Sequence, residues 1–161
     1  MHEFEVPNSS DKRELYAQLA PQLAALLEGE RDAIANAANM AALLYYALPE
    51  VNWAGFYFLR GRELVLGPFQ GRPACVRIAV GKGVCGTAAE RGESVLVPDV
   101  HAFPGHIACD AASRSELVVP LKTGDRLIGV LDLDSPREGR FDDADREGCE
   151  ELSRIYVASI D

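Results

Sequence analysis

The spacing of the strand-forming segments is the feature that most limits how this chain can fold. Two segments with strand-like composition, Glu116–Leu121 and Arg126–Asp134, are separated only by Lys122-Thr123-Gly124-Asp125. Parallel neighbours need a crossover of about a dozen residues, whereas antiparallel neighbours need only a short turn. The two segments therefore predict an antiparallel hairpin and argue against a doubly wound parallel sheet.

Helical periodicity marks the two ends of the chain. Leucines recur at helical spacing over Arg13–Leu27, where Pro21 predicts a break or kink. A second helix is predicted over Arg31–Leu48, and a last one from the N-cap Asp142 to about Ile160. The apolar stripe expected on the second helix is Ile34, Ala38, Ala41, Leu44, Tyr45 and Leu48.

Short strands and turns fill the middle of the chain. The predicted strands cover residues 52–59, 64–66, 75–80, 94–97, 116–121 and 126–134, with a short helix at 84–90. Terminal helices around five or six such strands predict an α+β fold with a central, mostly antiparallel sheet and the N- and C-terminal helices packed on one face. We expect residues 1–12 to be a flexible lead-in and residues 13–161 to form one domain.

Charge and cysteine usage exclude several classes of protein. Sixteen Lys and Arg against 25 Asp and Glu give a formal charge of −9, which argues against a nucleic acid or a membrane as partner. The N-terminus has no signal-peptide pattern, which predicts a cytoplasmic location. The four cysteines include no Cys-x-x-Cys pair, so a zinc ribbon is unsupported.

One cysteine lies in an unusually polar and long loop. Cys109 follows His101 and His106 within residues 98–114, which are rich in Pro, Gly, His and Asp. A protonated histidine or an array of backbone N–H groups would favour the thiolate of Cys109. An incidental loop cysteine explains the local sequence equally well.

Two further cysteines lie near predicted element starts. Cys75 begins a predicted strand, and Cys85 begins the short helix, whose N-terminus would favour a thiolate. Either residue by itself is better explained as a small core residue. Three cysteines outside the terminal helices nevertheless favour dithiol chemistry, because a second thiol condenses with a sulfenic acid.

Carboxylates gather on one face of the predicted hairpin. Asp132 and Asp134 share a face, and a hairpin loop of three or five residues sets Glu116 opposite Asp132. A two-residue loop would instead set Glu116 opposite Leu133. Clustered carboxylates repel unless a cation or shared protons relieve them, so the cluster predicts a site for a ligand ammonium or a metal ion. The alternative is a solvated strand end.

An aromatic strand offers a second candidate wall. Trp53, Gly55 and Tyr57 share a face, and the glycine between the two aromatic residues leaves room for a small apolar or cationic group. The alternative is an aromatic core in which Gly55 eases close packing.

Several motifs occur together along the chain: Asn52-Trp53-Ala54-Gly55-Phe56-Tyr57, Gly67-Pro68-Phe69-Gln70-Gly71, Ala74-Cys75-Val76-Arg77-Ile78, Gly83-Val84-Cys85-Gly86-Thr87, His106-Ile107-Ala108-Cys109-Asp110, Ser113-Arg114-Ser115-Glu116 with Val118-Val119-Pro120-Leu121, and Gly129-Val130-Leu131-Asp132-Leu133-Asp134-Ser135. From about Arg13 to Ile160 the chain resembles the free methionine-R-sulfoxide reductases, enzymes built on a single GAF domain. The gaps of 10 and 24 residues between Cys75, Cys85 and Cys109 agree with the three-cysteine pattern of that family.

The resemblance implies a role for each candidate residue. It implies Cys109 as the nucleophile, Cys75 as the resolving cysteine and Cys85 as an auxiliary thiol. The acidic cluster that holds the substrate would be Glu116, Asp132 and Asp134, and the aromatic walls near the S-methyl group would be Trp53 and Tyr57.

The resemblance also implies a reaction. Free L-methionine-R-sulfoxide would be reduced through a sulfenic acid and an intramolecular disulfide, with a thioredoxin-like protein as external reductant and no metal or other cofactor. The alternatives are a GAF sensor that binds a small ligand or senses oxidants, and a metal site that uses His106, Cys109 and the carboxylates. The sequence leaves open whether a homodimer forms, and which carboxylate binds the ammonium.

Overall fold

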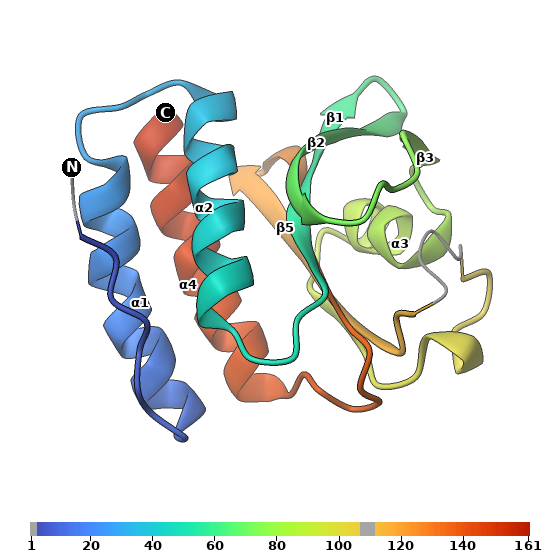
Figure 1. Cartoon of the computed structure of the whole chain (residues 1–161). Coiled ribbons are helices and arrows are strands. Elements are labelled where there is room, and N and C mark those ends of the chain that lie inside the picture. Colours follow the sequence, from blue (N-terminus) through green and yellow to red (C-terminus); the bar gives the residue numbers. More distant parts are fainter. Residues whose placement is uncertain (1–2, 107–111) are drawn as a thin grey trace.

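An antiparallel sheet forms the centre of the molecule (Figure 1). The computed structural model describes residues 3–106 and 112–161, and within them six strands follow the order β3-β2-β1-β6-β5-β4. The strands are β1 (Trp53–Arg60), β2 (Glu63–Gly71), β3 (Arg77–Ala79), β4 (Val95–Val97), β5 (Ser115–Thr123) and β6 (Arg126–Ser135). All neighbours in this order pair antiparallel, which confirms the predicted α+β fold.

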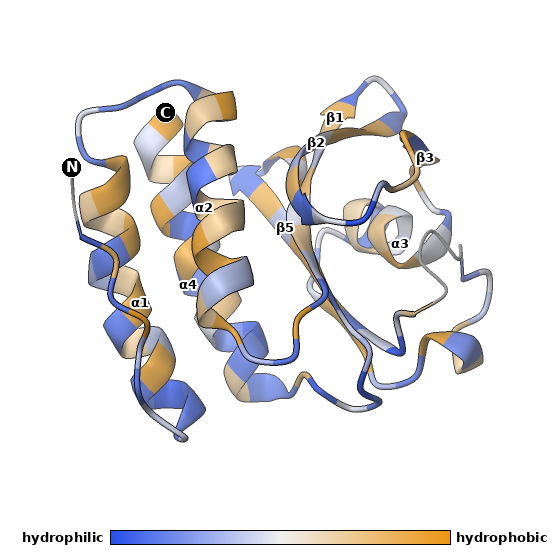
Figure 2. Ribbon diagram, viewed as in Figure 1, coloured by the Kyte–Doolittle hydropathy of each residue, from blue (hydrophilic) through white to orange (hydrophobic). Residues whose placement is uncertain are grey.

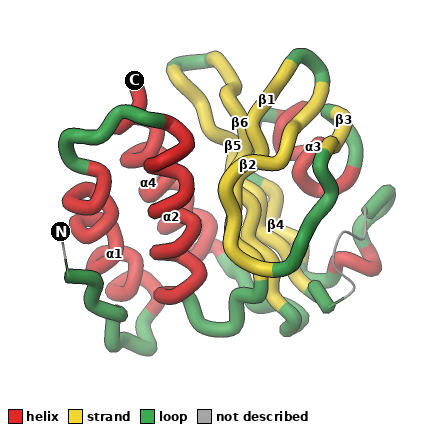
Figure 3. Tube along the Cα trace, turned by 45° about the horizontal axis from the view of Figure 1, so that its top comes forward, coloured by secondary structure: helices red, strands yellow, loops and turns green. Residues whose placement is uncertain are grey.

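Helices cover both faces of the sheet. The terminal helices α1 (Lys12–Leu27), α2 (Ala33–Ala47) and α4 (Asp143–Ile160) lie on one face, as predicted, and α3 (Gly83–Arg91) lies on the other (Figures 1 and 3). A 3₁₀ turn, η1 (Val100–Ala102), follows β4. The helices carry both apolar and polar residues around their circumference (Figure 2), as expected for surface helices that cover a sheet.

Alternation along the strands divides the core in two. On β1, Phe56 and Phe58 belong to the core under the terminal helices, whereas Trp53 and Tyr57 belong to the core under α3. Successive residues of a strand point to opposite faces, so one strand contributes to both cores. Gly55 lets Phe69 and Trp53 pack closely against the backbone of β1, because an added Cβ would overlap both side chains.

The structure corrects details of two predicted helices. A break or kink was predicted at Pro21, and helix α1 is not broken there: Pro21 and Ala17, whose carbonyl loses its partner, both lie on the exposed side, where water can bind the carbonyl. On α2, Ala41, Leu44 and Leu48 of the predicted stripe are buried, whereas Ile34 and Ala38 are exposed. Met40 is buried as well.

The register of the β5–β6 hairpin differs from the predicted one. Thr123 pairs with Arg126 around a two-residue turn, and a bulge between Leu121 and Lys122 then shifts the pairing. Glu116 consequently faces Asp134 rather than Asp132. A shift of two residues preserves which side chains share a face, so the predicted clustering of the carboxylates survives the error.

Element boundaries near Cys75 also differ. Strand β2 extends to Gly71, well beyond the predicted end at Leu66, and β3 begins only at Arg77. Cys75 therefore lies in the connection between β2 and β3 rather than at the start of a strand.

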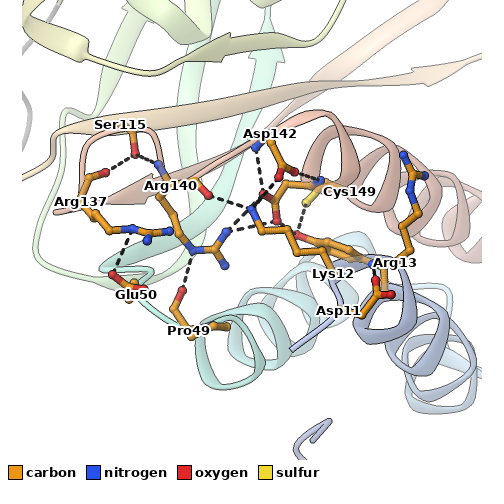
Figure 4. A network of polar contacts seen from close by, with 12 residues as sticks. Asp11, Lys12, Arg13, Pro49, Glu50, Ser115, Arg137, Arg140, Asp142 and Cys149 are labelled. Atoms are coloured by element: carbon orange, nitrogen blue, oxygen red, sulfur yellow. Dashed lines mark hydrogen bonds and ion pairs between the residues drawn. The ribbon is translucent and has the colours of Figure 1, made fainter. Parts of the chain in front are cut away.

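A buried ionic network fixes the terminal helices to the end of the sheet (Figure 4). The side chains of Arg140 and Asp145 are only 4% and 1% exposed and form an ion pair of 3.2 Å. Asp145 also accepts hydrogen bonds from Lys12 Nζ at 2.6 Å and from the Tyr16 hydroxyl at 2.7 Å. The backbone N–H of Arg140 donates to Ser115 Oγ at the start of β5, next to the acidic cluster.

Asp142 is the N-cap of helix α4, as predicted. Asp142 and Asp145 form a reciprocal capping box at its first turn. None of the helices in the described residues is long and apolar enough to cross a membrane.

Candidate functional site

A cavity lies between α3 and the sheet, on the face opposite the terminal helices. Strands β1, β5 and β6, the first turn of α3 and the β2–β3 connection all contribute to its walls. Its polar and titratable lining consists of Tyr57, Lys82, Cys85, His106, Ser113, Glu116, Asp132 and Asp134. The structure thus brings together every predicted site residue that it describes except Cys75, which is not in the cavity lining but whose carbonyl accepts a hydrogen bond from the Tyr57 hydroxyl.

The three carboxylates lie side by side at the end of the β5–β6 hairpin. Glu116 pairs directly with Asp134, and Asp132 lies two residues earlier on the same face of β6. Glu116 and Asp132 are only 6% and 5% exposed, and Asp134 is half-buried. The alternative of a solvated strand end is therefore wrong for Glu116 and Asp132.

Protonation relieves the repulsion within this cluster. Burial, together with the charges of Asp132 and Asp134, raises the pKa of Glu116 well above its usual value. Burial also raises the pKa of Asp132, but hydrogen bonds from Glu116 and Cys85 oppose the rise. The arrangement favours a protonated Glu116 that donates to an ionised Asp132.

Cys85 is a neutral thiol in this environment. Its Sγ lies in the first turn of α3, 4.0 Å from Glu116 Oε2. Burial, followed by the charge of Asp132, raises the pKa of Cys85 well above its usual value. Burial among carboxyl groups opposes the thiolate that the helix N-terminus would favour, which agrees with the interpretation of Cys85 by itself as a small core residue.

Stacked aromatic rings form one wall of the cavity. Trp53 stacks on Tyr57 with ring centroids 6.0 Å apart and on Phe69 with centroids 5.1 Å apart. The Tyr57 hydroxyl donates to the Cys75 carbonyl at 2.9 Å, and Trp53 Nε1 donates to the Arg72 carbonyl at 3.0 Å. These bonds hold both rings in place and leave their faces as apolar contact surface.

The cysteines fall into three groups. Cys75 is disulfide-bonded, whereas Cys85 and Cys149 are free thiols. Cys109 lies outside the described residues. Cys149 is buried in α4 on the opposite face of the sheet, where its thiol contacts Tyr16, and burial raises its pKa to about 12. This placement agrees with the absence of a predicted role for Cys149.

His106 does not supply the positive charge that the sequence suggested. Burial, and to a lesser extent His101, lowers its pKa. The two imidazole rings lie edge to face with centroids 6.5 Å apart. A neutral His106 can still donate or accept a hydrogen bond at the cavity.

Two residues near the site were missed from the sequence. Phe69 stacks on Trp53, and Ser113 Oγ lies buried in the cavity wall without a hydrogen-bond partner among the described residues. Phe69 belongs to a quoted motif, but its contact depends on the pairing of β1 with β2, which periodicity does not reveal.

The site can hold a small cation. Cys85 Sγ and one carboxylate oxygen each of Glu116 and Asp132 lie within 4.8 Å of one another. Asp132 Oδ1 is buried and has no hydrogen-bond partner among the described residues. An ammonium group would satisfy this oxygen, and the aromatic wall would contact an apolar group beside it.

Comparisons with known proteins agree with this geometry. A model of the GAF domain matches residues 36–161. The free methionine-R-sulfoxide reductase of Escherichia coli (strain K12) is 55% identical over 142 residues, which cover 88% of this chain and 86% of the relative. The enzyme of the same name from Saccharomyces cerevisiae is 42% identical, over 92% of this chain and 87% of the relative.

A solved structure extends the comparison to three dimensions. The structure of free methionine-R-sulfoxide reductase from Neisseria meningitidis in complex with its substrate matches with a TM-score of 0.95 and 46% identity. The match covers 99% of this chain and 96% of that one. The fold around the cavity is therefore shared over nearly its whole length.

Proposed function

The chain belongs to the GAF-domain family and, within it, to the free methionine-R-sulfoxide reductases, and we propose from this that it reduces free L-methionine-R-sulfoxide through thiol chemistry in the cavity beside α3. The enzyme is an oxidoreductase. The observation that carries the proposal is the buried acidic cluster, which combines a protonated carboxyl, an unpartnered carboxylate oxygen and an aromatic wall in one cavity.

The acidic cluster would bind the substrate ammonium. Asp132 Oδ1 is buried without a partner among the described residues, and Asp134 stands beside it on the same face. A charged ammonium compensates a buried carboxylate, whereas the uncharged amide nitrogen of a peptide-bound residue does not. This difference would restrict the enzyme to the free amino acid.

Glu116 would supply a proton to the sulfoxide oxygen. Burial and the neighbouring carboxylates of Asp132 and Asp134 raise its pKa well above the usual value, which favours the protonated form. A positioned carboxylic acid acts as general acid when a leaving oxygen gains charge. Trp53 and Tyr57 would contact the S-methyl group on the opposite side.

The redox steps follow from the chemistry of thiols. After reduction of the disulfide at Cys75, the Cys109 thiolate attacks the sulfoxide sulfur. The oxygen takes up the proton from Glu116, its bond to the substrate sulfur breaks and it is transferred to the Cys109 sulfur, so that methionine leaves and Cys109 becomes a sulfenic acid. The Cys75 thiol condenses with it, releasing water and forming a disulfide. A thioredoxin-like dithiol then exchanges with this disulfide and restores both thiols. No metal, flavin or nucleotide takes part in these reaction steps.

Cysteine variants test these steps separately. With Cys109→Ser we expect no methionine to be released, because the attacking sulfur is absent. With Cys75→Ser we expect release of about one methionine per enzyme, followed by a stall, because the sulfenic acid has no partner. The measurement is the methionine released over time with a thioredoxin system.

A matched control separates chemistry from loss of fold. Cys149→Ala removes a buried thiol on the other face of the sheet and should cycle like the unmodified enzyme. Undiminished cycling of the Cys75→Ser variant would rule out Cys75 as the resolving cysteine.

A further inference from the structure

The cavity contains a set of ligand atoms that an ammonium group does not require. Cys85 Sγ lies together with one oxygen of Glu116 and one of Asp132, all within 4.8 Å of one another. The three residues are 3%, 6% and 5% exposed, so bulk water does not satisfy them. Thiolate sulfur and carboxylate oxygen are both ligands that Zn²⁺ accepts.

Unpartnered polar atoms point independently to a bound cation. Asp132 Oδ1 and Ser113 Oγ are both buried in the cavity wall, and neither has a hydrogen-bond partner among the described residues. A buried carboxylate oxygen without a partner is destabilising, and a bound cation removes that cost. The oxygen belongs to one of the three residues of the ligand set.

The geometry is close to that of a zinc site. Tetrahedral Zn²⁺ holds sulfur at about 2.3 Å and carboxylate oxygen at about 2.0–2.2 Å, so neighbouring ligand atoms lie about 3.5 Å apart. Cys85 Sγ and Glu116 Oε2 are 4.0 Å apart, and no pair in the set exceeds 4.8 Å. Shifts of about 1 Å by these side chains would close the set and leave one position for water.

We propose that Cys85, Glu116 and Asp132 form an inhibitory site for Zn²⁺ within the cavity. On binding, the Cys85 thiol and the Glu116 carboxyl each release their proton to solvent, and the metal takes the oxygen of Asp132 that the ammonium would use. The metal is an inhibitor and not a cofactor, because it occupies the place of the substrate. Metal binding rests on the geometry alone, whereas the inhibition rests on the proposed function.

Cadmium provides a direct probe of the sulfur ligand. We would titrate Cd²⁺ into protein oxidised until two of its four cysteines react as free thiols, since Cys75 is disulfide-bonded in the structure. We expect one equivalent to bind with an ultraviolet thiolate-to-cadmium charge-transfer band, and Zn²⁺ to displace it. Absence of that band would overturn the proposal.

Matched variants identify the thiol. Cys85→Ala should abolish the charge-transfer band, whereas Cys149→Ala, which removes the other free buried thiol, should retain it. Asp132→Asn keeps both thiols and should weaken Cd²⁺ binding at least about tenfold. A band that persists in Cys85→Ala places the metal elsewhere. Circular dichroism of each variant shows that it is folded, and the Asp132→Asn result stands if Cys85→Ala fails to fold.

Kinetics then distinguish the two proposals. In the reduced enzyme, Zn²⁺ should inhibit competitively with free methionine-R-sulfoxide, and a chelator should restore activity. Turnover without any cadmium band refutes the metal site and leaves the proposed function intact. A cadmium band without turnover of any sulfoxide refutes the proposed function and leaves the metal site intact.

Discussion

Asp132 and Glu116 are buried to a similar extent but differ in protonation, and this difference gives them different roles. Glu116 is surrounded by the charges of Asp132 and Asp134, so it takes up the proton. Asp132 accepts hydrogen bonds from Glu116 and Cys85 on one side and keeps Oδ1 without a partner among the described residues. One carboxyl can thus donate a proton while its neighbour binds a cation.

Asp132→Asn should weaken selection of the free amino acid. Loss of a charge-assisted hydrogen bond costs roughly 1.5–3 kcal/mol, so kcat/KM for free methionine-R-sulfoxide should fall about 10- to 150-fold. The preference over the N-acetylated sulfoxide should shrink accordingly. Steady-state kinetics with both substrates measure this change.

Asp125→Asn is the matched control for this variant. It makes the same chemical change at an exposed turn residue and should leave both rates unchanged. An unaltered preference in Asp132→Asn would contradict the assignment of Asp132 to the ammonium.

Glu116 should also make the stability of the fold depend on pH. Its pKa is raised in the folded state, so the folded chain holds a proton that the unfolded chain releases above a pKa of about 4.5. Below this pKa of the unfolded chain, the contribution of Glu116 to the free energy of unfolding is fully present. That contribution is lost as the pH rises towards the higher pKa of the folded state. The decline is at most about 1.4 kcal/mol per pH unit.

Urea unfolding of the protein and of Glu116→Gln, with a chelator present, tests this sign. The free energy of unfolding of the unmodified protein should fall relative to that of the variant between about pH 5 and pH 7. Parallel curves over that range would show that Glu116 is ionised in the folded state.

At the scale of elements, the β5–β6 hairpin shows what the sequence could and could not predict. Alternation alone indicated that Glu116, Asp132 and Asp134 share a face, because parity survives a shift of two residues. The bulge at Leu121 and Lys122 was not predictable, since no residue in the turn demands it. The carboxyl groups that surround Cys85 were not predicted for a similar reason, because these contacts depend on tertiary packing rather than on position in a helix.

The network around Arg140 holds the end of this hairpin. Arg140 donates to the Pro49 carbonyl at 2.8 Å and pairs with Asp145, so a buried cation joins the end of α2 to the start of α4. Its backbone N–H reaches Ser115, the neighbour of Glu116 (Figure 4). The contacts secure the sheet end from the side opposite the cavity.

Asp145→Asn should destabilise the protein strongly. It leaves the buried Arg140 without its ionised partner, which costs about 3–5 kcal/mol in comparable buried pairs. Glu151→Gln removes one partner of the exposed Arg154–Glu151 pair and should cost less than about 1 kcal/mol. Urea unfolding compares the two, and equal effects would contradict a structural role for the network.

At the scale of the whole molecule, the sheet separates the core that stabilises the fold from the cavity that contains the candidate site. The core under α1, α2 and α4 contains Cys149 and the Arg140 network, whereas the face under α3 contains the cavity and Cys85. Substitutions in the first core should therefore act on folding, and those in the second on binding and turnover. A cytoplasmic location and thioredoxin as reductant stay predictions, and the sequence leaves open whether a homodimer forms.

The most direct test of the account is turnover of three substrates in parallel. Free L-methionine-R-sulfoxide, its S epimer and an N-acetylated sulfoxide would each be supplied with thioredoxin, thioredoxin reductase and NADPH. We expect NADPH consumption with the free R epimer alone. The N-acetylated compound lacks the ammonium that the acidic cluster would bind, and the preference for the R epimer is expected from the family. Equal consumption with the N-acetylated compound would contradict that requirement, and no consumption by folded, reduced protein would contradict the reductase function itself.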